Sequence, residues 1–235
     1  MPPKGLKTLS KKKKKTKEPV EIFDVGRPRP QRALDCARIM VDFLEAMFHK
    51  LALQYCDLKG KVADSFCGIL YYRCAREAIR TYMTDMRSTL RYWISHQHLT
   101  RFSVVLKDVQ SGEELGIITF GLFSGTDRNW ASKAIRKGVI HELKDQLMIL
   151  FEKLDELPTR EQFLKDFGER EVGAKIRLSL LPEVPKPDLV SAIKWKHDPD
   201  ALCAPKKKLL YSTPRINSEF VEFSLQCSSS IIGKD

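Results

Sequence analysis

The residues best able to do chemistry in this 235-residue chain are its six cysteines and five histidines, and their spacing decides their use. No two cysteines form a Cys-x-x-Cys pair, and no two-plus-two ligand spacing is present, so no zinc site is predicted. His96 and His98 lie two residues apart in an expected loop without a nearby cysteine, which favours ordinary polar loop residues. We expect free thiols, several of them facing the core, and neither a metal nor a cofactor.

Nucleophilic and phosphate-binding chemistry finds little support either. His197 and Asp198 have the order of a base and its orienting carboxylate, yet no nucleophile with a recognisable motif accompanies them. Gly112 and Gly116 do not belong to the Gly-x-x-x-x-Gly-Lys-Ser/Thr pattern of a phosphate loop. We expect a protein without catalytic activity. An enzyme of unrecognised type stays an alternative class, which a pocket of titratable groups with perturbed pKa values would favour.

The positive charge of the chain is concentrated at its N-terminus. The net charge is +11, and residues 1–32 hold eleven Lys and Arg against three acids, which leaves 30 bases against 27 acids elsewhere. Residues 1–31 are predicted to be a disordered basic tail, because Lys11, Lys12, Lys13, Lys14 and Lys15 repel one another and prolines follow. This lysine run is a candidate nuclear import signal, with a solubilising tail or a weak phosphate-binding arm as the alternatives. No apolar stretch approaches the ~20 residues of a membrane span, so we expect a protein that stays inside the cell with no membrane partner. The lysine run makes the nucleus the expected location.

Apolar periodicity predicts three long helices. Apolar residues recur at spacings of three and four over 32–53, 70–94 and 132–154, with a loop predicted at 54–68. Phe43 and Phe48 widen the first stripe, which indicates a helix buried on more than one side.

Strand patterns fall between and after the helices. A hairpin is predicted from strands 102–107 and 115–123, because Ser111-Gly112 supplies a turn between β-branched runs. Residues 175–180 alternate apolar and polar side chains, as a half-buried strand does. A proline-rich irregular segment at 181–218 precedes a last strand at 219–226. The order predicts an α+β fold with one mostly antiparallel sheet and the helices packed on it. An irregular segment of this length inside a domain is usually functional or disordered, and its apolar residues Trp195, Leu202, Leu209 and Leu210 favour a functional one.

The order of these elements resembles that of the HORMA domain family, and three stretches carry the resemblance. Val41-Asp-Phe-Leu-Glu-Ala-Met-Phe-His49 resembles the start of the family's long first helix. The hairpin resembles the family hairpin through Arg101-Phe-Ser-Val-Val-Leu-Lys-Asp108, Gly112-Glu-Glu-Leu115 and Ile118-Thr-Phe120. The C-terminal segment resembles that of the accessory subunit of translesion DNA polymerase zeta through His197-Asp-Pro199, Pro205, Ser212, Ile216 and strand 221–226.

The resemblance implies a HORMA domain over 32–228, with 181–226 as a safety belt and 229–235 as a flexible C-terminus. In the family the belt wraps a short partner peptide, which adds a strand to the sheet edge. The residues implied to contact the peptide are Trp195, Leu202, Pro205, Leu209, Leu210, Tyr211, Ile176 and Leu178. A strand carrying Val221, Phe223 and Leu225 is implied to bridge to a second partner.

The implied function is that of a non-catalytic adaptor in translesion synthesis and the DNA damage response. The implied partners are a proline-containing peptide of the polymerase zeta catalytic subunit, a second translesion polymerase, and a second HORMA protein in a dimer. A spindle-checkpoint or meiotic chromosome-axis HORMA protein is the alternative within the family. A nucleic-acid-binding module that uses the basic tail is the alternative of another class. Residues 33–235 are nearly neutral, which favours weak or absent direct DNA binding.

Overall fold

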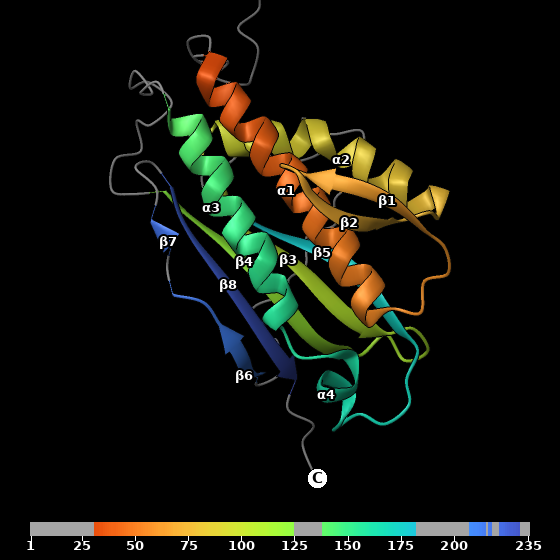
Figure 1. Ribbon diagram of the computed structural model, residues 1–235. Helices are drawn as coiled ribbons and strands as arrows, with labels where there is room; N and C mark the ends of the chain where they lie inside the picture. Colours follow the sequence, from red (N-terminus) through yellow and green to blue (C-terminus); the bar gives the residue numbers. More distant parts are fainter. Residues whose placement is uncertain (1–30, 125–137, 182–206, 215, 218–220, 231–235) are drawn as a thin grey trace, which may run out of the picture.

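In a computed structural model the chain adopts an α+β fold in which helices cover one face of an antiparallel sheet (Figure 1). The structure describes residues 31–124, 138–181, 207–214, 216–217 and 221–230. Its elements are α1 (Gln31–Tyr55), β1 (Lys61–Phe66), β2 (Ile69–Cys74), α2 (Glu77–Ser95), β3 (Leu99–Asp108), β4 (Glu114–Ser124), α3 (Val139–Lys153), η1 (Leu154–Glu156), α4 (Arg160–Leu164), β5 (Val172–Leu180), β6 (Lys207–Ser212), β7 (Ile216–Asn217) and β8 (Val221–Ser230). The predicted tail 1–30, with Lys11 to Lys15, and residues 231–235 lie outside the described residues.

Helix α1 is the centre of the core. Its apolar residues recur on more than one side, so it packs against α2, β2, α3 and the sheet at once. The ring of Phe43 lies 4.9 Å from that of Phe120 on β4 and 5.7 Å from that of Phe66 on β1. Phe120 in turn stacks on Phe223 of β8 at 5.4 Å. One path of aromatic contacts therefore joins the outer β1–β2 hairpin, α1 and two strands of the sheet.

The main sheet has the order β5-β3-β4-β8-β6, with β7 paired to β8. The β3–β4 hairpin is confirmed, and Val104 of β3 pairs with Ile118 of β4 on one side and Ile176 of β5 on the other. The predicted last strand is present as β8 and pairs with β4 along its length. It continues to Ser230, beyond the predicted end at residue 226, and Ser229 and Ser230 are buried. β5 and β6, which flank the long proline-rich segment, form opposite edges of the sheet.

The predicted loop at 54–68 is confirmed only at residues 56–60 and at the turn 67–68, and the predicted helix is wrong from residue 70 to residue 76. Residues 61–66 and 69–74 form the two-stranded sheet β1–β2, and α2 begins only at Glu77. The turn is made by Cys67 and Gly68, both with positive φ (49° and 92°), as a two-residue hairpin turn of type I′ requires. Cys-Gly is not the usual Asn-Gly signal for that turn, and the spacing of Tyr71 with later apolar residues mimics a helical stripe.

Smaller differences concern the segments that follow β4. The predicted third helix extended back to residue 132, but residues 125–137 lie outside the described residues and α3 begins after Gly138. η1 and α4 were not predicted, although Thr159 and Gln162 form a complete capping box at the start of α4. β6 and β7 lie within the segment predicted to be irregular.

Helix α4 is held against the sheet by a close approach at Gly116 of β4. A Cβ atom built on Gly116 would lie 2.4 Å from Cζ of Phe163 and 2.5 Å from the carbonyl oxygen of Ser228 on β8. Only a residue without a side chain lets Phe163 pack flat over β4 at this point. Phe163 also packs edge-on against Tyr55 at 5.3 Å, which ties α4 to the end of α1.

Candidate functional site

The outer edge of β5 is the candidate site, because within the described residues no strand pairs with it. β5 pairs on its inner side with β3 from Val172 to Leu180. An unpaired edge presents a row of backbone N–H and C=O groups that can accept another strand. The edge is nine residues long, which is enough for a peptide of several residues to pair with it.

The register shows which backbone groups point outward. Glu171 accepts a hydrogen bond through its carbonyl oxygen from Val109 N–H at 2.8 Å, and Leu181 donates to the carbonyl oxygen of His98 at 2.9 Å. These odd-numbered positions therefore face β3. Because an antiparallel strand alternates between its two sides, the even-numbered residues direct their N–H and C=O groups to the open edge. Within β5 they are Val172, Ala174, Ile176, Leu178 and Leu180.

The chain connects this open edge to the opposite edge of the sheet. β5 ends at Leu180, and the next described strand is β6, which begins at Lys207 and pairs with the far side of β8. Crossing from β5 to β6 covers four strand spacings, or roughly 19 Å. After β6, two hydrogen bonds between Thr213 and Leu225 hold the chain against β8. Thr213 accepts through its hydroxyl from Leu225 N–H at 3.0 Å and donates its own N–H to the Leu225 carbonyl oxygen at 2.9 Å.

An ion network on the sheet face without described helices joins the two ends of this connection. Glu114, at the start of β4, accepts hydrogen bonds from Arg177 of β5 at 2.8 Å and from Lys207 of β6 at 2.6 Å. The three side chains are only 11%, 16% and 21% exposed, respectively. Burial by itself would raise the pKa of Glu114, but the bonds from Arg177 and Lys207 outweigh it and lower that pKa. The carboxylate therefore stays ionised and ties both edge strands to the centre of the sheet.

The structure separates the residues predicted to contact a peptide into two groups. Ile176 and Leu178 lie on β5, where Ile176 is buried and Leu178 is partly buried against the core. Leu209, Leu210 and Tyr211 lie on β6 at the opposite edge of the sheet. Leu209 is 58% exposed, whereas the hydroxyl of Tyr211 donates to Glu156 of η1 at 2.8 Å. The two groups therefore lie on different strands at opposite edges of the sheet. The segment of the chain between β5 and β6 connects them.

The other predicted site residues either lie outside the described residues or serve the core. Trp195, Leu202 and Pro205, together with His197, Asp198 and Cys203, lie outside them. On β8, Phe223 and Leu225 are buried at 0% and 1% exposure. Those two side chains are therefore not accessible to a second partner. The backbone of Val221 pairs with Ser124 of β4. The role of Glu114 had no signal in the sequence.

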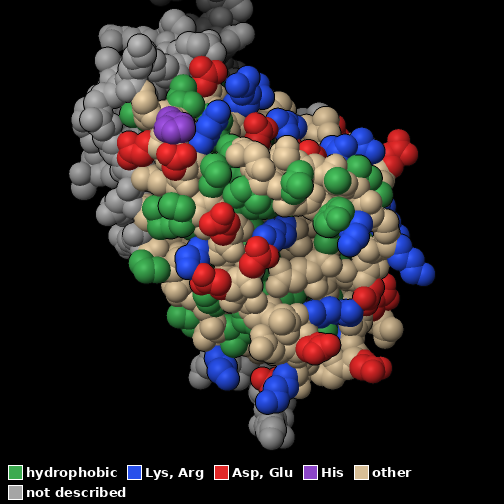
Figure 2. Space-filling view, in the orientation of Figure 1, with side chains coloured by type: hydrophobic (Ala, Val, Ile, Leu, Met, Phe, Trp, Pro, Cys, Tyr) green, Lys and Arg blue, Asp and Glu red, His purple; other side chains and the backbone are tan. Residues whose placement is uncertain are grey.

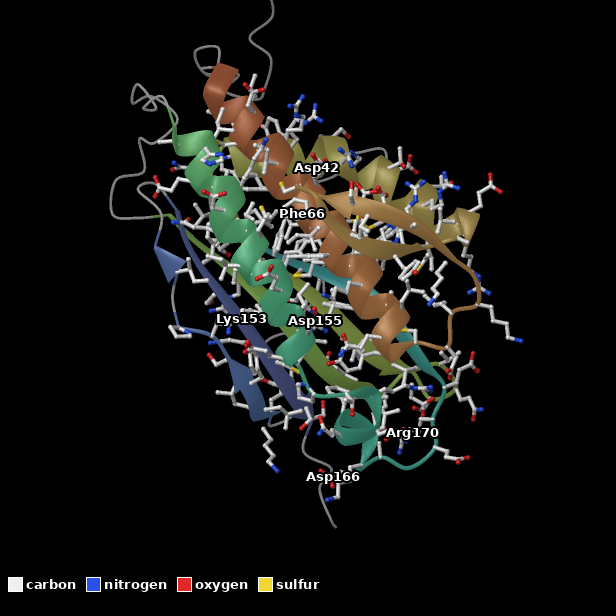
Figure 3. All side chains as sticks on the ribbon, viewed as in Figure 1. Asp42, Phe66, Lys153, Asp155, Asp166 and Arg170 are labelled. Carbon is white, nitrogen blue, oxygen red and sulfur yellow. The ribbon has the colours of Figure 1, made fainter. Side chains whose placement is uncertain are left out.

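A separate cavity of about 560 Å³ lies between α1, the β1–β2 hairpin, α2 and α3. Asp42 of α1 and Phe66 of β1 line it and are labelled in Figure 3. Several of its charged groups have partners, since Arg87 bonds both Asp42 and Glu45. Arg73, within the range predicted to be the second helix, lies on β2 and pairs with Asp64 at 3.4 Å. The cavity is thus lined by internal ion pairs, which favours a structural role.

The described cysteines and histidines show no nucleophile or metal site. Five described cysteines are free and four of them are buried, as predicted. Burial raises the pKa of Cys227 to about 12, and burial chiefly raises that of Cys56 to about 12, so both stay protonated thiols. In the described residues no group of three His, Cys, Asp or Glu side chains is placed to hold a metal ion. No helix in this part of the chain combines the length and apolar character that a membrane span needs.

Comparison with known proteins identifies the fold. No family model and no curated protein matches the chain. A chain of the mitotic checkpoint complex matches with a TM-score of 0.59 at 13% identity, over 83% of this chain and 98% of that one. Caenorhabditis elegans HTP-2 bound to the HIM-3 closure motif matches with a TM-score of 0.54 at 12% identity, over 82% and 89%. HTP-1 of the same organism bound to HTP-3 motif-1 matches with a TM-score of 0.53 at 11% identity, over the same shares.

These neighbours are HORMA-domain proteins, so the chain has the HORMA-like α+β fold that its sequence resembles. At identities of 11–13% the likeness establishes the fold. What the chain binds has to be argued from its own edge strand and charges.

Proposed function

We propose that this chain is a non-catalytic adaptor that holds a short peptide of a partner protein against the outer edge of β5. The observation that carries the proposal is the open edge itself, from which the chain continues to the opposite edge of the sheet. An extended peptide would satisfy the outward groups of Ala174, Ile176, Leu178 and Leu180 by adding a strand. The HTP-2 and HTP-1 structures hold bound motifs, which supports the same use of this fold.

The length of the connection between the edges supports a clamp. Residues 182–206 number 25, and 25 extended residues reach roughly 80 Å, several times the ~19 Å between β5 and β6. A connection this long has enough chain to pass around a bound strand and return to β6. Trp195 and Leu202 are two of the apolar residues in this proline-rich stretch, and we propose that they contact the peptide.

Hydrogen exchange tests the proposed edge without any substitution. Addition of a partner peptide should slow exchange of the outward amides of Ile176 and Leu178, because they gain hydrogen bonds. The inward amide of Arg177, already facing β3, is the internal control and should change less. Protection confined to β1–β2 or to the helices, with none at β5, would contradict capture at this edge.

We further propose that the partner is the catalytic subunit of translesion DNA polymerase zeta, which would make this chain its accessory subunit in the DNA damage response. The resemblance of the first helix, the hairpin and the C-terminal segment supports this assignment. The same role places the chain in the nucleus, bridging to a second translesion polymerase, with a HORMA–HORMA dimer as a further assembly. Deleting residues 1–30 should then reduce nuclear accumulation and leave folding intact, whereas unchanged accumulation would remove the import role of the lysine run.

A spindle-checkpoint or meiotic-axis role is the second candidate, because the solved structures with this fold include the mitotic checkpoint complex and HTP-2. Affinity purification from cells followed by mass spectrometry separates the candidates. Recovery of polymerase subunits supports the first assignment. Recovery of checkpoint or chromosome-axis proteins in their place would overturn it and leave the peptide-holding function standing.

A further inference from the structure

The edge strand β5 carries two different rows of side chains. Ala174, Ile176, Leu178 and Leu180 face the helices and pack against or within the core. Lys175 and Arg177, between them, face the opposite side of the sheet. A strand added to β5 places its side chains directly beside these two rows, at about 5 Å between Cβ atoms. A strand that pairs with β5 therefore meets apolar side chains on one face of the sheet and charged side chains on the other.

On the charged side, most of the described charged side chains near the edge of β5 are basic. On the face of β5, β3 and β4 that carries no described helix, the register of the described residues aligns four bases, Lys175, Arg177, Arg101 and Lys107, with one carboxylate, Glu114. Glu114 is already bonded to Arg177 and to Lys207 of β6. Within the described part of the chain, Lys175, Arg101 and Lys107 form no ion pair. On the helix-covered face, by contrast, acids and bases are interspersed (Figure 2).

We propose that the partner peptide is an alternating one, with apolar side chains toward the helices and acidic side chains over Lys175 and Arg177. This inference rests on the proposed capture of a peptide at β5 and specifies the chemistry of that peptide. Positions two apart on a strand lie roughly 7 Å apart, so the two acids stand at i and i+2. Both strand directions keep this alternation, because the side-chain period of a strand is two.

A single-stranded nucleic acid is the other polyanion that a basic face attracts, and the geometry argues against it. Such sites combine cations with aromatic rings on which bases stack. On this face of β5 and β3, beside which an added strand would lie, the register places Ser103, Val105 and Ser179 among the bases but no aromatic residue. The apolar row of β5 would also have no counterpart in a nucleic acid strand.

The test compares designed peptides on the full chain by fluorescence anisotropy. Three labelled peptides alternate Val with Glu, Gln or Lys over eight residues, and a fourth contains the Val and Glu residues in two blocks. We expect the alternating Glu peptide to bind roughly ten-fold or more tightly than the Lys peptide, since two opposite-charge pairs replace two like-charge pairs. The block peptide should bind more weakly than the alternating one, because it cannot place apolar and acidic residues on separate sides.

Matched charge reversals locate the effect. Lys175→Glu should abolish the preference between the Glu and Lys peptides, because one like-charge and one opposite-charge pair then remain for either peptide, whereas Lys165→Glu, an equal charge change on the exposed end of α4, should leave it intact. Equal binding of the Glu, Gln and Lys peptides would overturn the acidic preference and leave edge capture standing. Failure of every peptide to bind would count against capture at β5 itself. Tight binding of a labelled oligothymidine that Lys175→Glu abolishes would overturn the proposal in favour of nucleic acid.

Discussion

Replacing Glu114 by Gln should destabilise the fold and loosen both edges of the sheet. The wild-type carboxylate accepts charge-assisted hydrogen bonds from Arg177 at 2.8 Å and Lys207 at 2.6 Å. Gln keeps the shape of the side chain but has one oxygen, and its amide nitrogen donates rather than accepts. One cation therefore loses its acceptor, and the repulsion between Arg177 and Lys207 is no longer offset.

The expected loss lies between the values for buried and exposed ion pairs. Hydrogen bonds to charged groups contribute ~1.5–3 kcal/mol each in protein interiors, whereas exposed pairs contribute ~0–1 kcal/mol. Glu114 is 11% exposed and its partners 16% and 21%, so the pair of bonds falls nearer the buried case. We expect Glu114→Gln to lower the free energy of unfolding by about 2 kcal/mol at pH 7.

The adjacent Glu113 is the matched control. It makes one bond, to Arg170 at 2.6 Å, and is 47% exposed, so Glu113→Gln should cost about 0.5 kcal/mol or less. Arg170 is labelled in Figure 3, near α4 and away from β6. Urea denaturation followed by circular dichroism measures both variants.

Acid provides a second check on the same network. The pKa of Glu114 is lowered in the folded protein, so its stabilisation is present above the unfolded pKa and is lost as the pH falls through the folded one. The difference between wild type and Glu114→Gln should therefore shrink as the pH falls below about 4, near the ordinary carboxyl pKa. In hydrogen exchange the amides of β6 should exchange faster in Glu114→Gln than in Glu113→Gln. Equal losses in the two variants, or a difference that persists in acid, would refute the reasoning.

Four further outcomes are expected. Gly116→Ala should lower the free energy of unfolding by ~1–3 kcal/mol in urea titrations, because its Cβ would meet Phe163 and the Ser228 carbonyl oxygen; an unchanged midpoint would contradict the close approach. Burial chiefly lowers the pKa of His49 to about 4, so wild type should lose stability from about pH 6.5 to pH 4, by roughly 3 kcal/mol, and His49→Gln should lack that slope. Leu178→Pro, which removes an outward N–H, should weaken peptide binding more than Leu178→Ala in proteins shown to be folded. Trp195→Ala should speed peptide dissociation roughly ten-fold in surface-binding kinetics, with an unchanged circular dichroism spectrum, and an unchanged off-rate would remove it from the clamp.

The parts of the fold that the sequence predicted are those where one periodicity dominates. α1 has apolar residues on more than one side, and it is buried accordingly. The β3–β4 hairpin and the alternation of β5 were predicted for the same reason. The β1–β2 hairpin was not, because Tyr71 fits both a strand row and a helical stripe, and only the positive φ of Cys67 decides between them.

The candidate site was predicted only in part, because it depends on pairing between distant segments. The alternation around Ile176 marks β5 as a strand, but nothing local shows that β5 lies at an edge. The edge position of β5 depends on β8 pairing with β4, and these two strands lie more than 90 residues apart in the sequence. The same holds for Glu114, whose partners Arg177 and Lys207 lie 63 and 93 residues away. The net charge of residues 33–235 did not reveal the local excess of bases beside β5, because acids elsewhere in that range cancel it.

The basic row of β5 also bears on why an open edge is tolerated. An exposed edge strand is a template for pairing with a second copy of the same chain, and charged residues on the edge oppose that pairing. If two β5 strands met side by side, Lys175 and Arg177 of one copy would lie beside the same two residues of the other. Like charges directly opposite are destabilising, whereas carboxylates in their place are stabilising. The side chains that keep copies of this protein apart are thus the ones that would select an acidic partner, so Lys175→Glu should weaken both the acidic preference and this protection.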